Sequence, residues 1–560
     1  MTRSFSFSSL CSGITIGIIM ASGFFLLSGR EITTETVEHA EKIAGLNFTP
    51  DQREQMLSNL QNNAEAFEVL RSYELSNDVP LPLYFDPTPP GKVIQNPPQH
   101  QNEWQIPSGV ELPEHHEDLA FYTVLELSSL VRERKISVVD LTTFFLNRLK
   151  EHDEKLEAIV TITEERALEQ ARKLDEELEN GRYRGPLHGI PYGAKDLFSV
   201  KGYKTTWGAT PYMDQEIDQT ATVIEKLDEA GAVLIAKTTL GALAYGDIWF
   251  GGRTNNPWNP EIGSSGSSAG SSSGTSAGLF PFALGTETLG SIVSPSTRNG
   301  VTGIRPTFGR VSRHGAMALS WTMDKVGPIA RTVEDAALVF DVIRGPDTFD
   351  HTVKDYSFNY QPDADLSEIK IGYVKPAFDS DYSQAETDRQ VLAVLEELGA
   401  DLIPIELPDL ALDGMFNVLT AEGAAAFDEL TLTGRDSLLV WQEDNAWPNS
   451  FRAVRFLPAV EWIQLNRVRA KLIAEMDEAI KDVDVYVSPA FAGGNLLITN
   501  LTGHPSVVLK NGYSDEGQPL SITFVGQLFD EANLISVAQK YQEATPWHNE
   551  HPPLFSRTGD

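Results

Sequence analysis

One lysine and one serine have the surroundings that acyl-transfer chemistry needs. Lys195 follows a short apolar run that predicts a buried strand. A lysine there is either salt-bridged or held neutral, and a neutral buried lysine can act as a base. Ser291 follows a tight turn, where consecutive backbone N–H groups can converge on one point. That convergence is the geometry that stabilises an oxyanion.

Between these two residues lies a run of almost pure glycine and serine, residues 263–278. Composition alone favours a flexible linker. However, the run continues directly into the apolar residues Leu279–Leu284, which require burial. We therefore expect a backbone packed close to its neighbours that opens into a buried helix.

Several short motifs occur in a fixed order along the chain and together resemble the amidase signature family. The resemblance covers about residues 117–553 and is specific because the motifs occur together and in order. The matching segments are His188–Pro191 with Lys195–Asp196, the serine-rich run, Gly285–Ser291, Gly303–Thr307, Asp324–Pro328, Arg331–Ala337 and Asn500–Pro505.

The resemblance implies a serine amidase with a Ser–cis-Ser–Lys triad. Ser291 is then the nucleophile, Ser267 the bridging serine after a non-proline cis peptide, and Lys195 the base, with Ser268 in support. The implied reaction is hydrolysis of a small-molecule amide, or ester, through an acyl-enzyme. The implied oxyanion donors are the backbone N–H groups of Thr288, Leu289, Gly290 and Ser291.

The chain departs from the family pattern near the nucleophile. It has Glu287 for Asp, Leu289 for Gly, Val293 for Arg, and Ser265 and Ala269 for Gly. Leu289 would restrict the turn if that position needs a positive φ. Loss of the arginine leaves Glu287 without its usual partner, and Arg298 is the candidate replacement. These departures keep a catalytically impaired homologue open as an alternative.

Other function classes compete with this interpretation. The run also fits the GxSxG pattern, with Ser268 or Ser272 as nucleophile, but no central strand can precede it because Pro257 and Pro260 interrupt the segment. A glutaminase-type subunit of a tRNA-dependent amidotransferase is a second alternative. A non-catalytic binding protein that keeps the fold is a third, and Lys195 alone is more often a partner of Asp196 or Glu287.

The amino-acid composition limits which partners, nucleophiles and cofactors the protein can use. The net charge of −35 disfavours a nucleic-acid surface, which needs lysine and arginine. The single cysteine, Cys11, lies in the leader, so the mature chain has no cysteine nucleophile. The eleven histidines show no metal-binding spacing, and we predict no metal and no cofactor. The sequence leaves a homodimer open.

The first 29 residues predict a signal peptide or a membrane anchor. No charged residue lies between Arg3 and Arg30, and Leu10–Leu27 is apolar. Cleavage after Ala21-Ser22-Gly23 fits a secretory signal, and an uncleaved anchor is the alternative that would tether the protein to a membrane. Both place the rest of the chain outside the cytoplasm, in the periplasm, outside the cell or facing outward.

The sequence after residue 29 predicts three parts and an α/β fold. Residues 30–75 read as a helical extension, 76–116 as a proline-rich linker or strap, and 117–556 as the catalytic domain. Strand-like and helix-like segments alternate through the last part, which favours a mixed central sheet covered by helices on both faces. Five aromatic residues are candidates for an apolar acyl pocket: Trp207, Tyr245, Trp249, Phe250 and Trp321.

Overall fold

The computed structural model describes residues 32–73, 75–410, 414–491 and 493–557. The chain divides into two units, Met1–Ser76 with Phe456–Pro458, and Asn77–Arg455 with Ala459–Asp560. The leader predicted over residues 1–29 lies outside the described residues. Among the described helices, none is long and apolar enough to cross a membrane.

The first unit contains two helices within residues 30–75. Helix α2 spans Thr34–Ala44 and helix α3 spans Pro50–Arg71. Thr49 caps α3 by accepting a hydrogen bond from the Gln52 N–H, and Pro50 fits its first turn. Arg53 pairs with Glu41 through Nε at 2.9 Å and through Nη2 at 2.8 Å. This ion pair joins the two helices.

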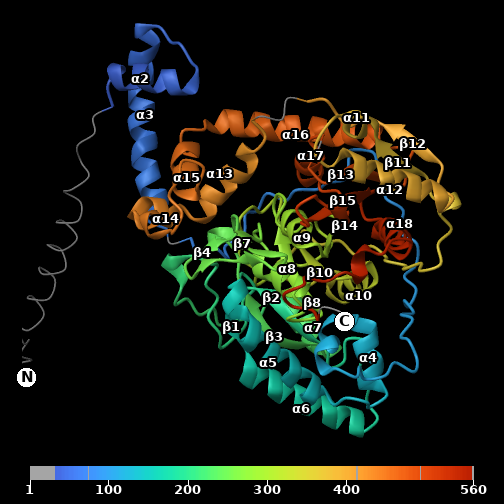
Figure 1. Cartoon of the computed structure of the whole chain (residues 1–560). Helices are drawn as coiled ribbons and strands as arrows, with labels where there is room; N and C mark the ends of the chain where they lie inside the picture. Colours follow the sequence, from blue (N-terminus) through green and yellow to red (C-terminus); the bar gives the residue numbers. More distant parts are fainter. Residues whose placement is uncertain (1–31, 74, 411–413, 492, 558–560) are drawn as a thin grey trace, which may run out of the picture. The chain divides into compact units, whose positions relative to one another are not determined.

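An eleven-stranded mixed sheet forms the centre of the second unit, as the fold-class prediction requires (Figure 1). Strands β2, β3 and β8 are parallel to one another, as are β11, β12 and β13, and antiparallel pairs join these groups. In spatial order the strands are β1 (Ile159–Ile162), β3 (Val233–Thr238), β2 (Pro191–Lys195), β8 (Phe282–Glu287), β10 (Lys325–Ala330), β9 (Thr302–Arg305), β14 (Ser506–Tyr513), β15 (Pro519–Gly526), β13 (Val485–Pro489), β11 (Ile371–Val374) and β12 (Leu402–Ile405).

Helices flank this sheet. They are α4 (Val124–Arg132), α5 (Val138–Leu156), α6 (Glu164–Glu179), α7 (Thr222–Ala230), α8 (Ala269–Ser276), α9 (Val293–Asn299), α10 (Val333–Ile343), α11 (Lys375–Asp379), α12 (Ala385–Glu397), α13 (Asn417–Ala426), α14 (Asp428–Thr433), α15 (Trp447–Val454), α16 (Ala459–Ala479), α17 (Asn495–Thr502) and α18 (Glu531–Glu543). Two short hairpins, β4 (Ile248–Trp249) with β5 (Gly252–Arg253) and β6 (Asn255–Asn256) with β7 (Asn259–Gly263), precede α8.

The glycine- and serine-rich run is not a linker. It forms α8, and all eight residues of that helix are buried. The apolar residues that follow enter the central strand β8 rather than a helix. Small side chains allow this close packing, since a Cβ on Gly270 would come within 2.1 Å of the Ala158 carbonyl oxygen. The serine-rich helix is therefore an interior element of the core.

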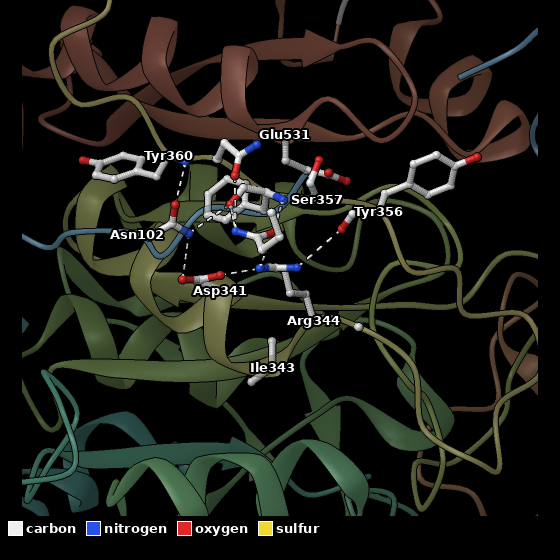
Figure 2. A network of polar contacts seen from close by, with 12 residues as sticks. Asn102, Asp341, Ile343, Arg344, Tyr356, Ser357, Tyr360 and Glu531 are labelled. Atoms are coloured by element: carbon white, nitrogen blue, oxygen red, sulfur yellow. Dashed lines mark hydrogen bonds and ion pairs between the residues drawn. The ribbon is translucent and has the colours of Figure 1, made fainter. Parts of the chain in front are cut away.

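Residues 77–113, called the strap from here on, form no helix or strand and are tied to the second unit by side-chain contacts. Phe85 packs edge-on against Phe308, and Trp104 stacks on Tyr360. Figure 2 shows one of these attachments, in which Asn102 donates to Asp341 and accepts from the Tyr360 N–H. These contacts give the strap a fixed course over the second unit.

Candidate active site

Lys195 ends strand β2 and is fully buried. Its Nζ donates to the Ser267 hydroxyl at 2.8 Å, the Thr286 hydroxyl at 2.9 Å and the Ser268 hydroxyl at 3.2 Å. Burial lowers the pKa of Lys195 to about 7, against smaller opposing effects of Asp324 and Glu287. An amine with that pKa is largely neutral just above pH 7, so it can accept a proton.

Neither carboxylate considered as a salt-bridge partner pairs with Lys195. Asp196 pairs with Lys237 at 2.6 Å, and both side chains are fully buried. Glu287 pairs with Arg305 at 2.7 Å. No carboxylate of the described residues lies within ion-pair distance of Lys195. Among these residues, Lys195 therefore has none of the salt bridges that would explain its burial without a catalytic role.

Ser267 lies two residues before the first residue of α8 and follows a cis peptide bond, as the sequence resemblance implies. Its hydroxyl receives the shortest hydrogen bond of Lys195. Gly266 lets this loop pass close to its neighbour, because a Cβ there would lie 1.9 Å from the Gly246 carbonyl oxygen. Ser268 contacts Lys195 and also accepts from the Thr286 N–H at 3.2 Å, which places it in support of the pair.

Ser291 lies in the turn between β8 and α9 and is 8% exposed. Its carbonyl oxygen accepts from the Ser268 N–H at 3.1 Å. Within the described ranges, its hydroxyl makes no direct hydrogen bond to Ser267 or Lys195. The structure therefore brings Lys195, Ser267 and Ser268 into direct contact, and links Ser291 to them through the Ser268 backbone.

The turn before Ser291 supplies free backbone donors. The N–H groups of Leu289, Gly290 and Ser291 donate to no acceptor among the described residues. The positive φ of the turn falls on Gly290, at 81°, and not on Leu289. Leu289 therefore does not restrict the turn in the way that its replacement of glycine suggested.

The predicted replacement partner of Glu287 is wrong. Arg298 is exposed on α9, and Glu287 instead accepts from Arg305 at 2.7 Å and from Asn500 at 2.7 Å. The other carboxylate oxygen of Glu287 accepts from the N–H groups of Ile292 and Val293, which directly follow Ser291. Burial is the largest single effect on the pKa of Glu287 and would raise it, but the charges of Arg305 and Lys325 together with the hydrogen bonds from Arg305 and the Val293 N–H outweigh burial and lower the pKa to about 2.

Sequence reasoning missed Thr286, Arg305 and Asn500 as members of this site. All three lie inside motifs that carried the family resemblance, but their types suggested no role. Their positions in β8, β9 and α17 bring them together only when the sheet forms. The sequence signal for Thr286 was its position one residue before Glu287, in a strand that leads to Ser291.

A small cavity beside Thr286 and Thr288 has mostly aliphatic walls, and none of the five aromatic candidates for an acyl pocket lines it. Trp207 packs against Tyr212, and Tyr245 packs against Trp441. The apolar walls of the cavity are Leu197, Ala244, Ala316, Met317, Leu319 and Val326.

Within the described ranges, no group of three or more His, Cys, Asp or Glu side chains could hold a metal ion.

Comparison with known proteins agrees with this fold. The amidase family model matches residues 140–496. A glutamyl-tRNA(Gln) amidotransferase subunit from Coxiella burnetii (strain Dugway 5J108-111) is 32% identical over 484 residues, or 77% of this chain and 99% of that protein. An amidase family protein from Bacillus anthracis superposes with a TM-score of 0.69 at 28% identity, covering 78% of this chain and 93% of that one. The peptide amidase of Stenotrophomonas maltophilia superposes with a TM-score of 0.68 at 27% identity, covering 77% and 98%.

This chain belongs to the amidase family. It is a hydrolase that acts on the C–N bond of amides.

Proposed function

We propose that the chain hydrolyses small carboxylic amides through an acyl-enzyme on Ser291. The observation that carries this proposal is the fully buried Lys195 amine, which contacts only hydroxyl and carbonyl oxygens and has a pKa lowered to about 7. A neutral amine in that position can take the Ser267 proton while Ser267 takes the proton of Ser291.

The remaining steps follow from the same groups. The Ser291 oxygen attacks the amide carbonyl carbon, and the free N–H groups of Leu289, Gly290 and Ser291 donate to the oxygen that becomes negative. The proton held on Lys195 returns through Ser267 to the departing amine, and the C–N bond breaks. Water then attacks the acyl-enzyme with the same lysine as base, which releases the acid and restores Ser291.

The amidotransferase relatives favour a more specific version of this reaction. They suggest that the amide is that of glutamine and that the released ammonia is passed on within a complex with other subunits. The net charge of −35 argues that another subunit would contact any tRNA. On the comparisons alone, this second candidate stands ahead of a free-standing amidase.

Ammonia release and probe labelling test the proposal together. Residues 30–560 would be incubated with glutamine and with simple aliphatic and aryl amides, and separately with a fluorophosphonate probe whose adduct is located by peptide mass spectrometry. We expect an adduct on Ser291. Turnover of glutamine alone would support the amidotransferase version, and turnover of several amides a free-standing amidase. An adduct on Ser268 or Ser272, or no adduct on folded protein, would contradict the mechanism.

The pH dependence of kcat/KM gives a second prediction. Only neutral Lys195 can act as the base, so activity falls as the pH drops below the lysine pKa of about 7 and levels off above it. The check is a profile of kcat/KM from pH 5 to 9 with a substrate that does not titrate in that range. A flat profile between pH 6 and 8 would show that no group of this pKa controls the reaction.

We also propose that the protein is exported, on the apolar segment Leu10–Leu27 of the sequence. Expression of the full chain with its native leader, followed by cell fractionation and determination of the mature N-terminus, tests this. An N-terminus near residue 24 in the exported fraction would identify a cleaved signal peptide. Full-length protein confined to the cytoplasm would contradict export and strengthen the amidotransferase version.

A further inference from the structure

The loop of residues 313–320 forms one wall of the small cavity beside Thr286 and Thr288. Hydrogen bonds to Leu197 and to Asp324 hold this loop at two places. The Met317 N–H donates to the carbonyl oxygen of Leu197, two residues after Lys195, at 3.0 Å. The N–H groups of Leu319 and Ser320 both donate to one oxygen of Asp324 at 2.9 Å. The loop therefore spans the space between the base and the nucleophile turn.

Asp324 connects this loop to the proposed oxyanion donors. Its other carboxylate oxygen accepts from the Thr288 hydroxyl at 2.6 Å. Burial raises the pKa of Asp324, and the hydrogen bonds from Thr288, Ser320 and Leu319 oppose that rise. A shift of the loop would move Asp324, and with it the residue that begins the nucleophile turn.

A third support for the loop comes from the strap, more than two hundred residues away in sequence. The Asn77 side chain donates from Nδ2 to the Ala318 carbonyl oxygen at 2.8 Å, and its Oδ1 accepts from the Ala318 N–H at 2.8 Å. One amide thus satisfies both backbone groups of the residue between Met317 and Leu319, which line the cavity. Only a side-chain amide offers a donor and an acceptor side by side in this way.

We propose that Asn77 is a positioning residue for the active site. By holding Ala318, it fixes the cavity wall and, through Asp324, the Thr288 end of the nucleophile turn. This role rests on the proposed function of Ser291. Asn77 lies outside the segment that the amidase family model matches, so the strap gives this chain a contribution to the site that the matched segment does not supply.

The strap offers a matched control for this inference. Asn96 makes an equivalent pair of backbone contacts, donating to the Asp355 carbonyl oxygen at 3.0 Å and accepting from the Ser357 N–H at 2.8 Å. Its partners belong to the segment around Tyr356 and Ser357 in Figure 2, which lines neither the cavity nor the nucleophile turn. Asn77→Ala and Asn96→Ala remove the same chemistry from the same strap.

The experiment compares both variants with the wild-type chain at a temperature where all three are folded. We expect Asn77→Ala to slow fluorophosphonate labelling of Ser291 by about tenfold, because both hydrogen bonds that hold Ala318 are lost. Amide hydrogen exchange of a peptide covering residues 316–320 should become faster in the same variant. Asn96→Ala should change neither readout.

Three results would overturn the inference. Unchanged labelling of Asn77→Ala, with Ser291 labelled normally in the wild type, would overturn the positioning role alone. Equal slowing in both variants would show a general effect of the strap on stability. A wild-type chain that is folded but not labelled at Ser291 would overturn the proposed function and this inference together.

Discussion

Replacing Ser291 by alanine is expected to lower kcat/KM by roughly 10⁵-fold to 10⁶-fold, and replacing Lys195 by methionine by about 10²-fold to 10⁴-fold. In the proposed mechanism the serine supplies the atom that forms the acyl-enzyme, whereas the lysine only moves its proton. The double variant should be no worse than Ser291→Ala, because groups that act in one proton-transfer chain are not additive. The measurement is single-turnover and steady-state kinetics on any amide that the wild type hydrolyses.

Stability separates this catalytic loss from simple unfolding. Lys195 has no ion-pair partner among the described residues, so methionine removes a costly buried amine without leaving a carboxylate unpaired, and the melting temperature should stay level or rise. Lys237→Met is the matched control. That lysine is equally buried but pairs with Asp196 at 2.6 Å, so its loss should destabilise the fold by about 3–5 kcal/mol. Comparable destabilisation by both variants would contradict the unpaired state of Lys195.

The predictions from sequence that agree with the structure rest on patterns of residues within short segments. A short apolar run before Lys195 predicts a buried strand, and β2 is buried along its whole length. The alternation of strand-like and helix-like segments predicts an α/β fold, and the structure has a mixed eleven-stranded sheet with helices beside it. Ordered motifs identified the family. These features depend on residues close together in sequence, or on a pattern that several segments share.

The errors concern contacts between segments that lie far apart in sequence. Arg298 is nearer to Glu287 in sequence than Arg305 is, but its position on α9 leaves it exposed, whereas strand β9 carries Arg305 into the core. Nothing local distinguishes these two arginines. The same holds for Asn77, whose partner is separated from it by 241 positions in the sequence and by five strands of the central sheet. Composition likewise cannot say which apolar side chains face a cavity, and none of the five aromatic candidates lines the cavity beside Thr286 and Thr288.

Arg305→Met should destabilise the fold by about 3–5 kcal/mol, measured by urea denaturation at pH 7, because it leaves the Glu287 carboxylate buried without its charged partner. Arg298→Met removes the same side chain from an exposed position 11 residues after Glu287. That control should change the free energy of unfolding by no more than about 0.5 kcal/mol. Activity should fall as well in Arg305→Met, since Glu287 holds the N–H groups of Ile292 and Val293 next to the nucleophile.

The stability difference between Arg305→Met and the wild type should depend on pH, and the pKa of Glu287 sets the direction of that dependence. In the wild type the Glu287 pKa is lowered from 4.5 to about 2, so its stabilising contribution is present above pH 4.5 and is lost as the pH falls toward 2. Without Arg305, burial should raise that pKa above 4.5, and the variant then gains stability relative to the wild type as the pH falls from 7 toward 4. A difference in stability that stays constant over that range would show that Arg305 acts by packing alone.

A double-mutant cycle then separates the charge of Glu287 from its hydrogen bonds. Glu287→Gln in the Arg305→Met background removes the uncompensated charge but keeps an oxygen that can accept from the Ile292 and Val293 N–H groups. This double variant should recover most of the stability lost in Arg305→Met, because the buried negative charge is the costly element. If activity recovers with stability, the two N–H contacts suffice to position Ser291; if only stability recovers, the ion pair itself sets the geometry of the turn.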